Sequence, residues 1–346
     1  MAQQTAPTQG DSPVKPARAD AGRKDTRPSA SPDPIVDAAE VDPLPPGDAI
    51  TSADAGLDSR LSGESHIKHV FIVIEENRDW DQIKDLPYFQ ELAQIGAHTE
   101  QYYNPRGIHP SAPNYVWMEA GANHGVTTDD DPPDSLIVGQ PHLTKLLDAA
   151  GISWMSYQED INPAICNITS KGNYAARHDP FLFFDDVVGD PASKNNAYCI
   201  AHHKPFTQFL PDLKAGKVAR YNFITPNIQN DMHEDDLERG DAWLKANIDP
   251  IVNPQHPSHN PQIYADSVVF VTFDEGDDPS DGPMAMIAIS PFAKRGFNET
   301  TGAPIAYHYT HSSLLRTLQE IFRVDRTLLG DAANARSLSS LFTVYP

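Results

Sequence analysis

Two uninterrupted apolar runs constrain the fold of this chain more than any other feature. One run covers residues 69–75 and the other covers residues 267–273. Both are rich in β-branched and aromatic residues, and neither alternates apolar with polar positions as a half-exposed strand does. This pattern is typical of strands that are buried on both faces in the middle of a parallel sheet. The sequence therefore predicts an α/β fold.

Oxygen-bearing side chains follow both runs at the point where the predicted strands end. Glu76 and Asn77 follow the first run, and Asp274 and Glu275 follow the second. Ligands bind at the carboxyl ends of strands in open α/β sheets, so we expect these four side chains to converge. Several carboxylates at one point need a neutralising charge, and oxygen ligands favour a hard cation. We therefore predict a metal site; the alternative is that acidic residues simply cap strands and begin loops.

The remaining patterns extend the same fold along the chain. Helices are expected at 88–96, after Ser111, and at 142–150, 239–248 and 311–322, and further strands at 152–157, 220–224 and 284–289. Residues 158–215 contain several prolines and are expected to be irregular. The alternation of strands and helices predicts a central, mostly parallel sheet flanked by helices.

Residues 1–64 differ from the rest of the chain in composition. They are rich in proline, alanine, aspartate and serine and contain no aromatic residue. Such a segment cannot bury enough apolar surface to offset the entropy lost on ordering. The sequence therefore predicts a disordered tail at 1–64 and one folded domain at 65–346.

Charge and hydropathy argue against two classes of protein. The chain carries 48 acidic and 26 basic residues, a net charge of −22, which argues against nucleic-acid binding. No run approaches the roughly 18 apolar residues that a transmembrane helix needs. The first residues also lack the hydrophobic segment of a signal peptide. We expect an exported protein, secreted or periplasmic, whose signal peptide is not present in this sequence.

The two cysteines, Cys166 and Cys199, flank a loop-like stretch. This arrangement is compatible with one disulfide in an oxidising compartment. The alternative is a pair of unpaired, buried thiols.

Ser111 is the candidate nucleophile. It lies at a predicted helix N-cap, with Pro113 in the first helical turn, where a missing N–H costs nothing. Free N–H groups at a helix start favour a bound phosphate, and a divalent cation on the hydroxyl oxygen would lower its pKa. The alternative is an ordinary N-cap serine. The G-x-S-x-G motif is absent around Ser111, which argues against a Ser-His-Asp hydrolase.

Three histidines and one aspartate are further candidates. Asp231 and His233 are two residues apart after a predicted strand, so both point the same way in an extended loop. They would ligate a second metal, hold substrate or protonate a leaving group, or else belong to a polar surface loop. His178 and His311 are each compatible with a catalytic or a structural role.

Together these segments resemble the bacterial phosphoesterase family of the alkaline phosphatase superfamily, which contains acid phosphatases and phosphocholine-specific phospholipases C. The resemblance covers roughly residues 66–325 in the same order. It rests on Glu76-Asn77-Arg78, His109 to Tyr115, Tyr174 to His178, Pro226 to His233, Gly240 to Leu244, Asp274-Glu275 and His311 to Leu318.

The resemblance implies roles for these residues. A single divalent cation, calcium, magnesium or manganese, would bind Glu76, Asn77, Asp274, Glu275 and the oxygen of Ser111. Ser111 would form a covalent phosphoserine, which water then hydrolyses. Substrate and phosphate oxygens would be held by His109, Asn114, His178 and Asp231, and His233 or, as second choice, His311 would protonate the leaving group.

The implied function is that of a metal-dependent acid phosphatase acting on phosphomonoesters, with phosphoinositides or other phospholipid headgroups as candidate substrates. One alternative is a phosphodiesterase of phospholipase C type, which the short chain argues against. The other is a catalytically silent, cation-binding surface protein. The presence of Ser111 together with its four ligand partners argues against a silent protein.

Overall fold

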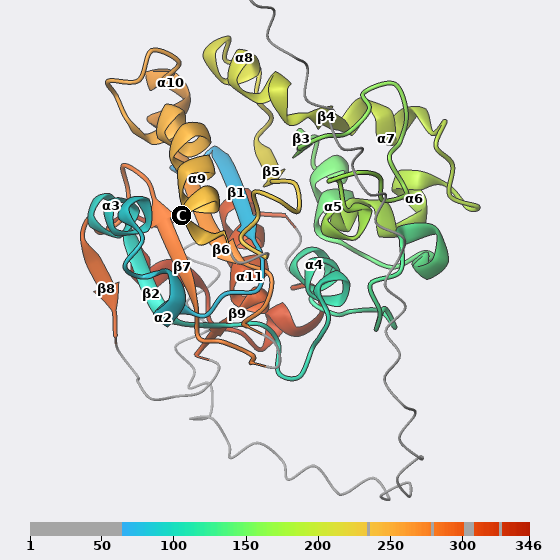
Figure 1. Ribbon diagram of the computed structural model, residues 1–346, viewed down its shortest axis with the longest axis horizontal. Helices are drawn as coiled ribbons and strands as arrows, with labels where there is room; N and C mark the ends of the chain where they lie inside the picture. The colour runs from blue at the N-terminus through green and yellow to red at the C-terminus, as the bar shows by residue number, and fades with distance from the viewer. Residues whose placement is uncertain (1–63, 234–235, 278–279, 301–307, 325–326) are drawn as a thin grey trace, which may run out of the picture. The chain divides into compact units, whose positions relative to one another are not determined.

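The structure, a computed structural model, describes residues 64–233, 236–277, 280–300, 308–324 and 327–346. The described residues form an α/β fold in which helices flank a mostly parallel sheet, as predicted (Figure 1). The predicted tail lies outside the described residues, except for its last position, Glu64.

The strands of the described residues form one nine-stranded sheet. They are β1 (His69–Glu75), β2 (Ala97–Tyr103), β3 (Trp154–Gln158), β4 (His203–Pro205), β5 (Tyr221–Thr225), β6 (Ser267–Phe273), β7 (Met284–Ile289), β8 (Phe297–Glu299) and β9 (Tyr309–Thr310). Their order is β4-β3-β5-β1-β6-β7-β2-β8, with β9 beside β2. β7 runs antiparallel to both neighbours, and the other pairings are parallel. The two apolar runs are thus β1 and β6, which are adjacent and parallel near the centre.

The helices connect the strands in the order that an α/β fold requires. They are α2 (Trp80–Ile83), α3 (Pro87–Ile95), α4 (Ser111–Ala120), α5 (Leu143–Ala149), α6 (Asp185–Val188), α7 (Ala197–His202), α8 (Phe209–Lys214), α9 (Leu237–Val252), α10 (Pro261–Tyr264) and α11 (His311–Phe322). The predicted bounds of β1, β6, β7 and α11 are confirmed to the residue. None of the helices in the described part of the chain is long and apolar enough to cross a membrane.

The prediction that residues 158–215 are irregular was wrong in part. Three short α-helices, α6, α7 and α8, three 3₁₀ helices and the short strand β4 lie in this stretch. Each has six residues or fewer, which is too short to display a full amphipathic period in the sequence.

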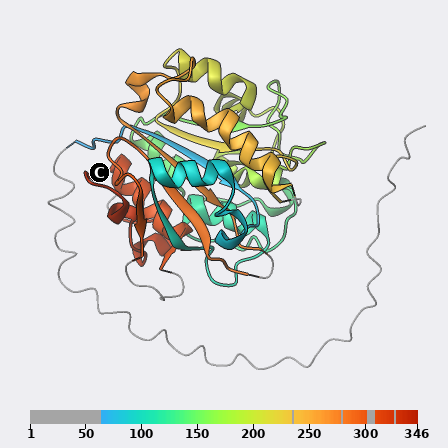
Figure 2. The same ribbon diagram turned by 60° about the vertical axis from the view of Figure 1, so that its left-hand side comes forward.

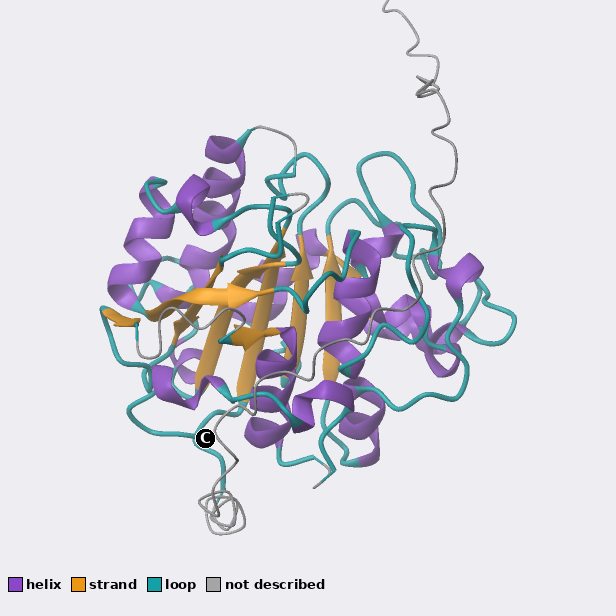
Figure 3. Ribbon diagram, turned by 90° about the horizontal axis from the view of Figure 1, so that it is seen from below, coloured by secondary structure: helices purple, strands orange, loops and turns teal. Residues whose placement is uncertain are grey.

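Aromatic contacts show which helices cover each face of the sheet. Phe71 of β1 packs against Phe209 of α8, with ring centroids 6.0 Å apart. Phe223 of β5 packs against Tyr115 of α4, with ring centroids 6.3 Å apart. Phe71 pairs with the residue before Phe223, and side chains alternate along a strand, so these contacts lie on opposite faces. Figures 2 and 3 show helices on both sides of the sheet.

Cys166 and Cys199 form a disulfide, with their Cα atoms 5.5 Å apart. It joins the segment after β3 to helix α7. The predicted pairing is therefore confirmed, and the alternative of two unpaired thiols was wrong.

Candidate functional site

The four side chains that follow β1 and β6 lie together, as the sequence predicts. The two strands are parallel and in register, so they end at the same edge of the sheet. The Asn77 backbone N–H donates to Asp274 Oδ1 at 3.1 Å, and Asn77 Nδ2 donates to Glu275 Oε1 at 3.2 Å. Glu76 and Asp274 are fully buried, and Glu275 is nearly so. Three carboxyl groups therefore share one buried space.

Ser111, the first residue of α4, lies at the same edge of the sheet. Pro110 rather than Ser111 is the N-cap residue, which corrects the predicted helix start by one position. Ser111 Oγ donates to Glu76 Oε2 at 3.2 Å. A hydrogen bond from Ser111 also lowers the pKa of Asp274, against the larger effect of burial. The hydroxyl thus lies between two of the predicted ligands.

Two other segments bring further ligand groups to Glu76. Asp231 follows β5, and its backbone oxygen accepts a hydrogen bond from the Glu76 N–H at 2.7 Å. His178 Nε2 lies 3.5 Å from Glu76 Oε2, and His178 Nδ1 lies 3.8 Å from Asp231 Oδ2. Ligand atoms of these three residues all lie within 4.8 Å of one another. The sequence expected both Asp231 and His178 to bind substrate, whereas their geometry also suits a metal ion.

Burial shifts the pKa values of the titratable groups in this space. Burial and then the neighbouring carboxylates of Asp274 and Asp231 raise the pKa of Glu76 well above its usual range. Burial raises the pKa of Asp231 and that of Asp274 to about 7, even though backbone N–H groups bond to both. Burial lowers the pKa of His178 well below its usual range. His178 is therefore neutral, which is the form that binds a metal.

Several polar atoms of these residues are buried without a hydrogen-bond partner among the described residues. They are Asn77 Oδ1, Asp231 Oδ2, Asp274 Oδ2 and both ring nitrogens of His178. Unpartnered buried polar atoms are costly and rare in folded proteins. Carboxylate and amide oxygens with one imidazole are suitable ligands for a divalent cation. The residues present therefore fit such a cation, and we call Glu76, Asn77, His178, Asp231 and Asp274 the acidic cluster.

Tyr115 of α4 contacts two members of the acidic cluster. Its hydroxyl donates to Glu76 Oε1. Its ring stacks on the ring of His178, with centroids 5.2 Å apart and 7° between the planes. The sequence analysis included Tyr115 in a motif but gave it no role. Its signal was its position four residues after Ser111, which puts both side chains on one face of a helix.

Glu275 is turned toward protein donors. Its Oε2 accepts from His109 Nδ1 at 2.6 Å and from Asn114 Nδ2 at 3.1 Å. The other ring nitrogen of His109 lies 2.9 Å from Asp281 Oδ1, and Asn114 Nδ2 also donates to the carbonyl oxygen of Ile108 at 2.9 Å. His109 and Asn114 were expected to bind phosphate, but these donors are committed to Glu275 and its surroundings. Their geometry fits the positioning of Glu275.

The two candidate acids differ in exposure. His311 is fully buried: Nε2 contacts the backbone oxygen of Asp274, and Nδ1 lies 3.0 Å from the Tyr102 hydroxyl. Burial lowers the pKa of His311 to about 4. This environment fits a residue that positions Asp274 and does not favour the general acid expected from sequence. His233 is exposed, and its backbone N–H donates to Asp231 Oδ1 at 3.0 Å, so its backbone lies beside the acidic cluster.

Arg177 brings a positive charge to the site. This charge lowers the pKa values of Glu76 and Asp231. Arg177 Nε lies 3.5 Å from Asp129 Oδ2, and Asp129 Oδ1 accepts from the N–H of Ala112 in the first turn of α4 at 2.9 Å. The sequence analysis did not single out Arg177. Its signal in the sequence was its position directly before His178 in the motif from Tyr174 to His178.

Curated relatives of the chain carry phosphatase names. The chain is 29% identical over 278 residues to the phosphatidylinositol-3-phosphatase of Mycobacterium tuberculosis, an alignment that covers 79% of this chain and 82% of the relative. It is 32% identical over 217 residues to a probable acid phosphatase of Kluyveromyces lactis, an alignment that covers 61% of this chain and 48% of the relative. It is 28% identical over 259 residues to the phosphate-repressible acid phosphatase of Penicillium chrysogenum, an alignment that covers 70% of this chain and 56% of the relative. The chain thus spans about half the length of these two fungal relatives.

Solved structures share the architecture. The human ectonucleotide pyrophosphatase / phosphodiesterase 5 aligns with a TM-score of 0.50 at 10% identity, covering 80% of this chain and all of that one. At this identity the likeness shows the fold alone, which is alkaline-phosphatase-like. The model of the Phosphoesterase family matches residues 82–325. The chain belongs to the Phosphoesterase family.

Proposed function

We propose that this chain hydrolyses phosphomonoesters in a metal-dependent reaction that passes through a phosphoserine on Ser111. Its family and its relatives named acid phosphatases support the phosphatase class. One observation carries the mechanism: Ser111 Oγ lies 3.2 Å from Glu76 Oε2, beside the unpartnered ligand atoms of the acidic cluster.

The acidic cluster would hold the cation. Glu76, His178 and Asp231 have the spacing of metal ligands, and Asp274 and Asn77 each add one unpartnered oxygen. When bound, a divalent cation lowers the pKa of a nearby hydroxyl and neutralises charge on a phosphate. The oxygen-rich ligand set fits calcium, magnesium or manganese.

The side chains supply nucleophile, proton acceptor and proton donor. Ser111 Oγ would attack phosphorus while its proton passes to Glu76, which already accepts its hydrogen bond. The Oγ–P bond forms as the bond from phosphorus to the leaving oxygen breaks, and His233 would give that oxygen a proton. Water then attacks the phosphoserine and gives its proton to His233, and Ser111 regains its proton from Glu76 as phosphate leaves.

The cellular location that we propose is outside the cytoplasm, in an oxidising compartment. The disulfide between Cys166 and Cys199 supports this, because such bonds persist in secreted and periplasmic proteins and are rare in the cytosol.

Replacement of the nucleophile tests the proposal. Ser111→Ala is expected to reduce hydrolysis of p-nitrophenyl phosphate to below a few per cent of wild type, because covalent catalysis is lost. Metal content, measured by mass spectrometry, should stay close to that of the wild type. Ser153→Ala is the control, because Ser153 precedes β3 at the opposite edge of the sheet.

Substrate choice separates the proposed phosphatase from the alternatives. Wild type should release phosphate from p-nitrophenyl phosphate much faster than it cleaves bis-p-nitrophenyl phosphate or p-nitrophenylphosphorylcholine. Preference for the two diesters would establish a phosphodiesterase of phospholipase C type. No turnover of any of the three in the presence of calcium, magnesium or manganese would indicate a silent cation-binding protein.

A further inference from the structure

The donors around the nucleophile that the sequence assigned to phosphate already have protein partners. The N–H of Ala112, in the first turn of α4, donates to Asp129 Oδ1 at 2.9 Å. His109 and Asn114 donate to Glu275 at 2.6 and 3.1 Å. A phosphoryl group that is attacked at this place still needs donors for its non-bridging oxygens, because charge develops on them in the transition state.

Arg78 and Arg177 both lie near the acidic cluster and differ in their partners. Arg78 donates from Nη1 to the backbone oxygen of Asn77 at 3.1 Å and from Nη2 to that of His233 at 2.9 Å. Arg177 forms no hydrogen bond with a described residue: its Nε is buried without a hydrogen-bond partner, and the 3.5 Å contact with Asp129 Oδ2 is an ion pair only. The guanidinium of Arg177 therefore keeps its donors available.

The carboxylate of Asp129 fixes the place of this guanidinium relative to the nucleophile. One of its oxygens accepts from the Ala112 N–H, and the other contacts Arg177 Nε. Since both contacts are to one carboxylate, Arg177 Nε is at most about 9 Å from the Ala112 nitrogen. Ser111 is the residue directly before Ala112. The planar guanidinium fork and one phosphoryl group on the Ser111 oxygen together cover that distance.

The residue after Arg177 joins the same turn to the acidic cluster. His178 Nε2 and Ser111 Oγ both contact Oε2 of Glu76, at 3.5 and 3.2 Å. Burial and then the charge of Arg177 lower the pKa of His178. The side chain of Arg177 is 27% exposed, whereas those of Glu76 and His178 are 0% and 2% exposed. The guanidinium is therefore close to the acidic cluster and also open to solvent.

A phosphomonoester suits such a guanidinium better than a phosphodiester does. A monoester carries roughly two negative charges and three strong acceptor oxygens. Arginine donates two parallel hydrogen bonds to phosphate oxygens through its planar fork. A diester lacks one of the acceptor oxygens and about half of the charge. It therefore offers less to an arginine when a cation binds the same group.

We propose that Arg177 is a catalytic residue that binds the non-bridging oxygens of the transferred phosphoryl group and favours monoesters over diesters. The inference rests on the proposed phosphatase function. Arg177 donates hydrogen bonds while the Oγ–P bond forms and the bond to the leaving oxygen breaks. It stays protonated throughout, so the proton transfers of the proposed reaction are unchanged.

Inorganic phosphate, the product, is the probe, because it has the same non-bridging oxygens. At a saturating concentration of the divalent cation, Arg177→Gln should raise the inhibition constant of phosphate about tenfold and lower kcat/KM for p-nitrophenyl phosphate about 10²-fold. Arg177→Lys keeps the charge and loses the fork, so both values should lie between those of Arg177→Gln and wild type. Metal content, measured by mass spectrometry, should match that of the wild type in both variants.

Arg220→Gln is the matched control. Arg220 is also partly exposed, and it directly precedes β5, at the opposite end of this strand from Asp231. Neither value should change by more than about twofold in this variant. An unchanged inhibition constant for phosphate in Arg177→Gln, or a loss of activity that follows a loss of bound metal, would overturn the inference. Arg177 would then only neutralise the acidic cluster, and the phosphatase proposal would stand.

Bis-p-nitrophenyl phosphate gives the comparison with a diester. The ratio of kcat/KM for p-nitrophenyl phosphate to that for the diester should fall about tenfold in Arg177→Gln, because the monoester loses more contacts. An unchanged ratio would contradict the role of Arg177 in the preference for monoesters. A wild type that does not hydrolyse p-nitrophenyl phosphate would instead refute the proposed function itself.

Discussion

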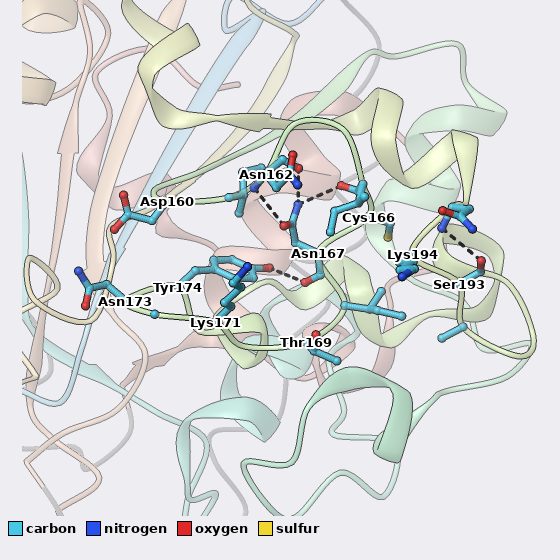
Figure 4. A pocket seen from close by; sticks show the side chains of 16 residues that line it. Asp160, Asn162, Cys166, Asn167, Thr169, Lys171, Asn173, Tyr174, Ser193 and Lys194 are labelled. Atoms are coloured by element: carbon cyan, nitrogen blue, oxygen red, sulfur yellow. Dashed lines mark hydrogen bonds between the residues drawn. The ribbon is translucent and has the colours of Figure 1, made fainter. Parts of the chain in front are cut away.

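The acidic cluster differs in burial and charge from a pocket of about 750 Å³ that is lined by residues between 160 and 174 and between 192 and 195 (Figure 4). We call this cavity the disulfide-closed pocket, because its lining includes Cys166, which is bonded to Cys199. Glu76, Asp231 and Asp274 are fully buried, and all three carry the same sign of charge when ionised. In the disulfide-closed pocket, Lys171 and Lys194 are exposed, and the lining combines neutral amides and hydroxyls with the Asp160 carboxylate. Buried carboxyl groups that lie close together need a cation to remain ionised, whereas exposed ammonium groups stay charged without a counter-ion. The two regions therefore differ in their need for a bound cation.

The two regions are also positioned by different forces. Glu76, Asn77 and Asp274 follow strands in the middle of the sheet, so their geometry is tied to global stability. The disulfide-closed pocket depends on loops, and His178 of the acidic cluster lies in the loop that the disulfide closes. Rigid elements hold a reacting group more accurately than loops do, and loops accept change more easily. The predictions below change these regions one at a time.

Removal of the cation should have the largest effect. Chelation with EDTA, and Asp274→Asn in the presence of metal, should each reduce hydrolysis of p-nitrophenyl phosphate by about 10²-fold or more, because electrostatic stabilisation of the transition state is lost. Asp266→Asn is the matched control, since Asp266 pairs with His69 at the opposite end of β6 and β1. Full activity after metal analysis has shown complete removal would refute the cation site.

Loss of His233 should have a smaller effect that depends on the leaving group. General acid catalysis is worth about 10² to 10⁴-fold, so His233→Ala should slow hydrolysis of an alkyl phosphate by an amount in this range. Hydrolysis of p-nitrophenyl phosphate should slow far less, because p-nitrophenolate leaves without a proton. His256→Ala, in the loop after α9, serves as control. Equal losses on both substrates would assign His233 to metal or phosphate binding.

Removal of the disulfide should affect stability more than catalysis. Cys166→Ser/Cys199→Ser opens a loop of 33 residues, for which chain entropy sets an upper limit of about 4 kcal/mol on the lost free energy of unfolding. Denaturant unfolding measures this loss. Below the unfolding temperature, kcat/KM for p-nitrophenyl phosphate should fall far less than in Asp274→Asn, because His178 is the one member of the acidic cluster in the opened loop. A loss as large as that of Asp274→Asn would show that the closed loop is needed to position the cation site.

The smallest expected effect is a pH dependence of stability in the metal-free protein. The pKa values of Asp231 and Asp274 are about 7 in the folded protein, against 3.8 for an ordinary aspartate. Between these pH values the folded state binds more protons than the unfolded state, so the free energy of unfolding falls as pH rises from 4 to 7. The metal-bound protein should not lose this stability, because the cation binds the ionised carboxylates.

Thermal unfolding at pH 5 and pH 7.5, with and without metal, measures the effect. The difference in Tm between metal-bound and metal-free protein should widen by a few degrees at the higher pH. In a control series, Asp231→Asn should reduce this increase in the Tm difference between pH 5 and pH 7.5. A difference in Tm that shrinks as pH rises would contradict the assignment of the acidic cluster as a cation site.

Sequence patterns predicted the elements that bury apolar runs and missed those that do not. β1 and β6 were predicted to the residue because both are mainly apolar runs that are buried almost throughout. β2 was missed because its residues, Ala97–Tyr103, are polar at most positions and alternate between buried and partly exposed. Strands of this kind are stabilised by their partners in the sheet rather than by a pattern of their own.

By itself, the sequence determined that Glu76, Asn77, Asp274 and Glu275 meet, because parallel buried strands must end at one edge. Only the tertiary structure decided which of these side chains keep oxygens unpartnered. Glu275 lies 161 residues from Asn114 and 166 from His109 in the chain, yet both donate to it. His178, from an irregular segment without periodicity, contributes unpartnered nitrogens instead. Hydrogen bonds between such distant segments depend on how loops pack, and no local pattern in the sequence encodes that packing.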